Sequence, residues 1–319
     1  MSEAAKSRLF NMPGFPKPVP KPRGRVQPYE VKMTPNMGMG VFATRDIKMG
    51  ELVFAERPLF GGPKNINMLS LEVPGSGFLA QKLVLDEYEK LLELCVERMS
   101  EANRTGYTGL TNSHKEDGSG PLTGISRTNG YGVAEVFDGV GPKPISDDFR
   151  YAFVGNTASR INHSCLHNVV RTFDIAAFAF VFTAVLDIKA GEQIFYPYCN
   201  IEASVAVRRR QLAPYGIVCE CRVCTNATPE SDKFREEYRS STVELFAQAQ
   251  QVMTGKSWPT NDEFRELLIF QKAAIEEGLH AVSAYQGILG ALTFAHMGRG
   301  HVAKVQELQV KMQKFAGIF

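Results

Sequence analysis

The pattern of apolar and polar residues divides the chain into a strand-rich first part and a helical second part. Apolar and polar positions alternate over residues 51–56, directly after the glycine-rich segment 38–50, and this period of two predicts two strands joined by a glycine turn. Further strand-like runs cover residues 132–137, 169–173, 176–186 and 193–198. We expect these runs to form a compact β-rich unit.

Helical spacing occurs in two regions. Within residues 78–104, apolar side chains recur three, four and seven or eight positions apart, which predicts an amphipathic helix with Glu and Lys on its outer face. Residues 105–124 are polar and glycine-rich and predict a loop. Beyond Cys224, apolar residues return at helical intervals as far as Met312, so several antiparallel helices are expected there.

Composition narrows the class of protein. With 319 residues, 44% of them hydrophobic, the chain can build one large domain or two small ones. Lys and Arg number 36 against 34 for Asp and Glu, so bulk charge gives no reason to expect binding to nucleic acid or to an anionic membrane. The most apolar stretch, 175–186, is shorter than the roughly 20 residues that cross a bilayer, and no transmembrane helix is expected.

The first 28 residues indicate where the protein is located in the cell and whether its N-terminus is ordered. Residues 1–10 carry charges among small residues and lack the apolar centre of a secretory signal, so we expect an intracellular protein, cytoplasmic and/or nuclear. Residues 11–28 interleave six prolines with lysine and arginine, which predicts an extended, flexible tail. A ligand for a polyproline-reading module is the alternative interpretation of that tail.

Cysteines indicate a metal site. Cys219, Cys221 and Cys224 fall on one tight turn, and zinc prefers four soft ligands in a tetrahedron. Cys165 is the candidate for the fourth ligand, because Cys95 belongs to the face of a predicted helix and Cys199 directly follows a strand. Free, reduced thiols are the alternative, although thiolates so close together repel one another without a cation. A site with four protein ligands would be closed and structural.

Three further features can serve either structure or chemistry. Asn162-His163 lies between apolar strands, so the pair either satisfies hydrogen bonds of the core or contacts a bound cofactor. Tyr198 ends a strand and is either a core residue or the orienting group for a nucleophile. The glycines of Gly38-Met39-Gly40 either make a turn or allow a ligand to approach the backbone. No βαβ pattern follows them, which disfavours a nicotinamide-binding fold.

Taken in order, four motifs resemble those of the SET-domain protein lysine methyltransferases. They are GMGVFATRDIKMGE at 38–51, RINHSC at 160–165, GEQIFYPY at 191–198 and CECRVC at 219–224. The helical insertion and the helical C-terminus are most similar to the SMYD group of that family. The resemblance implies an α+β fold with small sheets, a threaded, pseudoknot-like C-terminal segment and a cysteine-zinc turn after the SET core.

The same resemblance implies a division of the chain into six parts. These are a flexible proline-rich, basic lead-in at 1–28, N-terminal SET strands at 29–60, a helical insertion at 61–128, the SET core at 129–215, a post-SET zinc turn at 216–228 and a C-terminal helical region at 229–319.

The implied activity is S-adenosylmethionine-dependent transfer of methyl groups to a lysine side chain of a protein, histone or non-histone. Tyr198 and Tyr215 are the implied catalytic residues, and one structural zinc ion is implied at Cys165, Cys219, Cys221 and Cys224. The implied cofactor-binding residues are Gly38, Met39, Gly40, Asn129, Asn162, His163 and Ile217.

The chain also departs from the pattern of its group. Residues 60–128 offer only Cys95 and His114 as soft ligands, which are too few for the two zinc sites of a MYND finger. His167 stands where proline is usual, and Ile217 stands where many members place an aromatic residue over the adenine.

Two other functions remain as alternatives. A catalytically lapsed, zinc-binding scaffold would use the C-terminal helices to hold a protein partner. A zinc-dependent nucleic-acid binder would need a basic stripe near the cysteines. The run 208–210 of three arginines is the one candidate for that stripe, and we expect it to form the exposed face of a short helix instead. Direct nucleic-acid binding and membrane association are therefore not expected.

Overall fold

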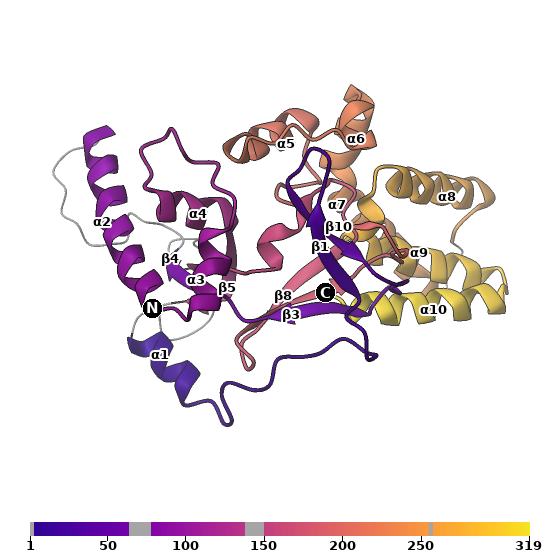
Figure 1. Ribbon diagram of the computed structural model, residues 1–319. Coiled ribbons are helices and arrows are strands. Elements are labelled where there is room, and N and C mark those ends of the chain that lie inside the picture. Colours follow the sequence, from indigo (N-terminus) through magenta and orange to yellow (C-terminus); the bar gives the residue numbers. More distant parts are fainter. Residues whose placement is uncertain (1–2, 64–77, 138–149, 255–257) are drawn as a thin grey trace.

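The computed structural model describes residues 3–63, 78–137, 150–254 and 258–319. Small sheets occupy the centre of the molecule, with a helical insertion on one side and the C-terminal helices on the other (Figure 1). In the described part of the chain, no helix is long and apolar enough to span a membrane.

Three small antiparallel or mixed sheets form the central unit. In the first, the strand order is β1 (Tyr29–Met33), β2 (Met39–Ala43), β10 (Gln193–Tyr196) and β7 (Asn162–His163). In the second, it is β3 (Leu52–Glu56), β9 (Ala179–Ala184) and β8 (Val169–Asp174). In the third, it is β4 (Phe60–Pro63), β6 (Arg150–Val154) and β5 (Gly130–Phe137).

Strand β10 joins segments that are far apart in the sequence. It pairs antiparallel with β2, where Ile194 lies opposite Val41, and parallel with β7, where Tyr196 lies opposite His163. Parallel strands need a long crossover connection. Here the hairpin β8–β9 fills that connection, and the pairing brings the Asn-His motif beside the strand that leads to Tyr198.

Aromatic side chains fill the core of the central unit. Phe54 of β3 stacks on Phe182 of β9 with ring centroids 4.7 Å apart, and both rings are buried. Phe173 and Phe180 add an edge-to-face contact at 5.5 Å. Rings and β-branched residues favour strands because they pack well on a pleated surface, which explains why these runs form sheets.

The helical insertion differs from its expected form. The predicted helix over 78–104 is two helices, α2 (Phe78–Glu97) and α3 (Glu101–Thr108), because the Ser100 hydroxyl caps α3 by accepting from the Asn103 amide. The predicted loop over 105–124 contains the start of a third helix, α4 (Pro121–Asn129). The Glu89 carboxylate accepts from two amides at the N-terminus of α4, where a negative charge is favourable.

The proline-rich lead-in makes contacts with the central unit. Helix α1 (Glu3–Phe10) precedes it, and the Lys17 amide donates to the Ala176 carbonyl at 2.8 Å. Arg57 donates to the Lys17 carbonyl at 3.1 Å, and the Phe15 ring contacts that of Phe178. The segment therefore lies along the central unit, although most of its side chains are exposed.

The C-terminal region is helical, as the spacing predicts. Two short helices, α5 (Val205–Leu212) and α6 (Arg222–Thr225), precede α7 (Pro229–Gln250), α8 (Asn261–Glu276), α9 (Tyr285–Gly298) and α10 (Val302–Ala316). Single turns of 3₁₀ helix are η3 (Ala158–Arg160), η4 (Ala213–Tyr215), η5 (Gln251–Thr254) and η6 (Leu279–Ala281). Capping boxes at Thr228 and Thr260 fix where α7 and α8 begin.

One buried cation links these helices to the central unit. Arg235 of α7 is 1% exposed, and its guanidinium bonds to the Glu277 carboxylate and to the carbonyls of Ile201 and Glu277. Ile201 lies between β10 and α5, whereas Glu277 caps the end of α8. One side chain therefore joins three segments.

We expect Arg235→Met to lower the free energy of unfolding by about 3–5 kcal/mol, because the change leaves Glu277 and two carbonyls without their partner. Urea denaturation followed by circular dichroism measures the loss. Lys233→Met on the same helix is the control: its side chain is 73% exposed, so its effect should stay within about 0.5 kcal/mol. Equal stability of the two variants would contradict the structural role of Arg235.

Candidate active site

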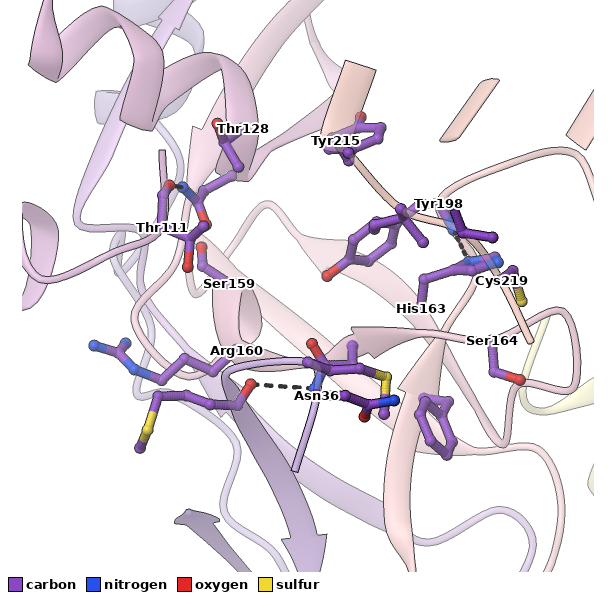
Figure 2. A pocket seen from close by; sticks show the side chains of 18 of the residues that line it. Asn36, Thr111, Thr128, Ser159, Arg160, His163, Ser164, Tyr198, Tyr215 and Cys219 are labelled. Carbon is purple, nitrogen blue, oxygen red and sulfur yellow. Dashed lines mark hydrogen bonds between the residues drawn. The ribbon is translucent and has the colours of Figure 1, made fainter. Parts of the chain in front are cut away.

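A cavity of about 610 Å³ opens between the central unit and the insertion. Figure 2 shows Thr111 and Thr128 of the insertion on one side and Tyr198 and Tyr215 on the other. The cavity's size lies within the range typical of small-molecule sites. Its walls come from residues 36–39, 109–111, 128–129, 159–164, 195–198 and 215–221.

A second cavity of about 300 Å³ adjoins the first. It is lined by Tyr131, Tyr196 and Arg171, and by five residues that also line the larger cavity. The two spaces therefore meet at a shared set of side chains: Thr128, Asn129, Ser159, Tyr198 and Tyr215.

The glycine segment and the Asn-His motif meet in the larger cavity's floor. The Asn162 amide donates to the Met39 carbonyl at 3.1 Å and to Gln193 Oε1 at 2.8 Å. A Cβ atom on Gly40 would lie 2.6 Å from Gln193 Oε1 and 3.1 Å from Asn162 Nδ2. Glycine is favoured at position 40 because a larger residue would collide with these side chains. It is favoured at position 38 because the backbone there has a φ of +68°, which other residues rarely adopt.

His163 and Tyr198 are linked through the backbone. His163 Nδ1 accepts from the Tyr198 amide at 3.0 Å, and the Tyr198 hydroxyl donates to the Ile161 carbonyl. Burial raises the pKa of Tyr198, so the hydroxyl stays protonated at neutral pH. The Tyr215 ring lies beside it with centroids 5.4 Å apart, and burial raises its pKa as well.

The other expected cofactor residues take different positions. Met39 and Ile217 line the larger cavity. Asn129 is the last residue of α4 and 7% exposed, and its amide nitrogen donates to the carbonyls of Thr111 and Ile125. Only its carbonyl oxygen is left for a ligand, so Asn129 acts mainly as a support for the wall between the cavities.

Several lining residues carry no signal in the sequence. Arg160 could have been noticed because it is the first residue of the RINHSC motif, but Asn36, Thr111, Thr128 and Ser159 lie outside the four motifs. Thr111 and Thr128 reach the cavity because the insertion folds back over the central unit, whereas Asn36 lies in the turn between β1 and β2 and Ser159 lies in η3.

The four expected cysteines come together. The sulfur atoms of Cys165, Cys219, Cys221 and Cys224 lie within 4.8 Å of one another, and this group could hold a metal ion. Hydrogen bonding to the neighbouring thiols raises the pKa of Cys165, whereas contact with Cys165 lowers that of Cys221 to about 6. Four thiolates at this spacing would repel one another strongly unless a cation lay between them.

Two further residues lie beside the cysteine cluster. Cys199, not chosen as a ligand because it follows a strand, forms a separate group with His163 and Cys165 within 4.8 Å. The expectation for the second residue is wrong. Arg208, expected on an exposed helix face, is fully buried and donates to the Ala203 and Val223 carbonyls. Its guanidinium also lies 3.7 Å from Cys224 Sγ, which favours the thiolate.

The chain was also compared with models of known protein families. A family model described as SET domain matches residues 38–199, which is half of the chain. The chain belongs to the SET-domain family. The matched residues run from just before β2 to just beyond β10 and include the insertion, whereas β1 lies before the match. Residues of this range line most of the larger cavity.

One curated relative is the histone-lysine N-methyltransferase set5 of Schizosaccharomyces pombe. It is 29% identical over 198 residues, which are 62% of this chain and 50% of that protein. This chain thus spans about half the length of the curated relative it matches.

Solved structures with some likeness include the SET domain of LSMT bound to lysine and AdoHcy, with a TM-score of 0.33 and 15% identity. That match covers 100% of this chain and 93% of the other. Rubisco LSMT bound to sinefungin and monomethyllysine gives a TM-score of 0.32 and 15% identity, with 100% and 88% covered.

The close approach at Gly40 yields a prediction about the SET domain. Gly40→Ala should lower the free energy of unfolding by about 1–3 kcal/mol, because the added methyl displaces Gln193 and Asn162. Gly38→Asn is the matched change: nothing lies within 4 Å of its Cβ position and asparagine tolerates a positive φ, so a smaller loss is expected. Both are measured by urea denaturation, and a tolerated Gly40→Ala would show that this floor is not rigid.

Proposed function

We propose that this SET-domain protein transfers methyl groups from S-adenosylmethionine to the side-chain amine of a lysine in a protein. The observation that carries the proposal is the pair of cavities that meet at Tyr198 and Tyr215. A group transfer between two substrates needs two binding spaces whose reacting atoms meet in line at one point. The larger space suits a cofactor and the smaller, tyrosine-lined space suits an extended side chain.

The residues of the larger cavity fit S-adenosylmethionine. Met39 and Asn162 line this cavity, and the glycines on either side of Met39 would let the cofactor approach the backbone closely. Arg160 is the cationic side chain among the described lining residues and would suit the cofactor's carboxylate, while Ile217 offers an apolar contact for the adenine. When bound, the cofactor would supply a methyl group on a positively charged sulfur.

The chain's own groups would do the rest. Tyr131, Tyr196, Tyr198 and Tyr215 line the smaller cavity, and such a desolvated space disfavours an ammonium and so favours the neutral amine that can attack. The protonated Tyr198 hydroxyl would orient that amine, and Tyr215 would narrow the passage between the cavities. No covalent intermediate with the protein is needed.

The placement within the family is also proposed. The helical insertion α2–α4 and the helices α7–α10 support an assignment near the SMYD group. Because residues 60–128 hold only Cys95 and His114 as soft ligands, such a member would lack the MYND finger. A histone and a non-histone substrate are both compatible with the cavity.

We expect Tyr198→Phe to retain cofactor binding and to lose at least about a hundredfold in the rate of methyl transfer, because the orienting hydroxyl is gone. Calorimetry with S-adenosylmethionine measures the first quantity, and radiolabelled transfer to mixed cellular protein measures the second. Tyr107→Phe is the control: its buried hydroxyl also donates to a carbonyl, that of Leu122, but lies outside both cavities.

The possible outcomes separate the two functional classes. Transfer that collapses only in Tyr198→Phe would support the enzyme. A folded protein that fails to bind S-adenosylmethionine would contradict it and leave the scaffold alternative, which Ile217 and His167 weakly favour.

We further propose that the four thiols hold one structural zinc ion. Zinc with bonds of about 2.3 Å to sulfur separates its ligands by roughly 3.8 Å in a tetrahedron. The distance from Cys165 to Cys224, 3.5 Å, is close to that value. Four protein ligands would leave no open position for water, so the ion would stabilise the turn that carries Tyr215 and Ile217.

Cys221→Ser should reduce bound zinc from about one ion per chain to a small fraction and lower the thermal midpoint, because the ion's binding energy contributes to folding. Atomic emission and calorimetry measure the two effects. Cys95→Ser, on α2 and outside the cluster, is the control for loss of a thiol. Cys199→Ser tests the fifth thiol: if it alone releases the zinc, the proposed ligand set is wrong.

A further inference from the structure

Arg171 is a charged group in the smaller cavity that the proposed transfer does not use. It lies on β8, and its guanidinium packs over the rings of Tyr131 and Phe180, 5.6 and 5.8 Å from their centroids. Nη2 donates to the Gly132 carbonyl at 3.0 Å. The side chain is thus fixed by two rings and one backbone contact, within the lining of the cavity.

The positive charge of Arg171 has no counter-ion in the described part of the chain. Its Nε and Nη1 are buried and have no hydrogen-bond partner. Among the described residues, no carboxylate forms an ion pair with it, in contrast to Arg235 and Arg239, which each pair with a glutamate. A partly buried guanidinium that no carboxylate neutralises is costly, so Arg171 is a candidate for binding an acidic group of a ligand.

The remainder of the smaller cavity adds no charge. Its other described lining residues are tyrosines, glycines and neutral polar side chains, together with Pro197. Arg171 therefore sets the sign of the potential in a space of only about 300 Å³. A lysine that enters with neutral or basic neighbours brings no charge to offset the guanidinium, whereas an acidic neighbour does.

We propose that Arg171 makes the smaller cavity selective for a lysine that has an aspartate or glutamate close to it in the substrate. The carboxylate accepts from the guanidinium, where Nη2 has a second hydrogen beyond the one given to Gly132. Charge-assisted bonds of this kind are about twice as strong as neutral ones. This inference rests on the proposed transfer to lysine, and it names the substrate class of that site.

Peptides that differ in one neighbour of the lysine test the proposal. Glutamate, glutamine or lysine is placed in turn at each of the two positions on either side, and kcat/KM is measured with S-adenosylmethionine. Affinity is measured separately by fluorescence anisotropy with S-adenosylhomocysteine present, so that binding is read without transfer. The wild-type protein should prefer glutamate over glutamine by about tenfold at one or more positions, which corresponds to about 1.4 kcal/mol.

Two variants connect that preference with Arg171. Arg171→Lys keeps the charge and should keep most of the preference, whereas Arg171→Gln should reduce the ratio to about twofold or less. The preference is the ratio of kcat/KM for the glutamate peptide to kcat/KM for the glutamine peptide, both measured on the same variant. A general loss of activity lowers both values and cancels in this ratio. Thermal midpoints show whether either variant is less stable than the wild type. If Arg171→Gln does not fold, the test uses Arg171→Lys alone: its glutamate preference should weaken as the salt concentration rises, because salt screens the charge.

The results separate this proposal from the proposed function. A glutamate preference that is lost in Arg171→Gln supports the inference, even if it is seen only in binding. If no peptide is methylated, the proposed methyl transfer is contradicted, but the inference about binding is not. Equal treatment of glutamate and glutamine at every position overturns the inference while leaving the transfer intact. A glutamate preference that persists in Arg171→Gln also overturns it, because the charge would then be read elsewhere.

Discussion

The double pairing of β10 is the constraint on which the site depends. One edge of this strand holds β2, with the glycine segment, and the other holds β7, with the Asn-His motif. Because register in a sheet is specified by which side chains are buried, Ile194 and Val41 in the core fix where Asn162 and Tyr198 lie. A slip of the pairing by one residue would move the side chains of β10 that face the core to the opposite face, and the walls of both cavities would be lost.

The cysteine cluster lies where the SET domain and the C-terminal helices share a core. Cys165 and Cys224 are buried in the same apolar cluster as side chains of α7, α8 and α9. Arg208 and Arg235 are buried nearby, each satisfied mainly by carbonyls. Most of the polar contacts at this junction are with backbone carbonyls, although Arg208 Nε has no hydrogen-bond partner. A change at Arg208 or Arg235 should affect the post-SET turn and its Tyr215.

The insertion gives the two cavities their second wall. Thr111, Thr128 and Asn129 reach the site from α4 and the segment before it. The Ser113 hydroxyl donates to the Pro214 carbonyl at 3.1 Å, directly next to Tyr215. Insertion and post-SET turn therefore meet beside the passage between the cavities, and neither wall is complete without the other.

Local pattern in the sequence predicted six of the strands (β2, β3, β5, β8, β9 and β10), the C-terminal helices, the four motifs and the set of four cysteines, because each depends on residue type and short-range spacing. It gave no signal for β1, β4 and β6. It missed the break at Ser100, where one hydroxyl caps a new helix, and the buried state of Arg208. Only the tertiary structure decided that two cavities meet at Tyr198 and that Arg171 lines one of them without a carboxylate partner among the described residues. The physical reason is that burial and pairing are properties of contacts between distant segments, and periodicity along the chain carries no record of those contacts.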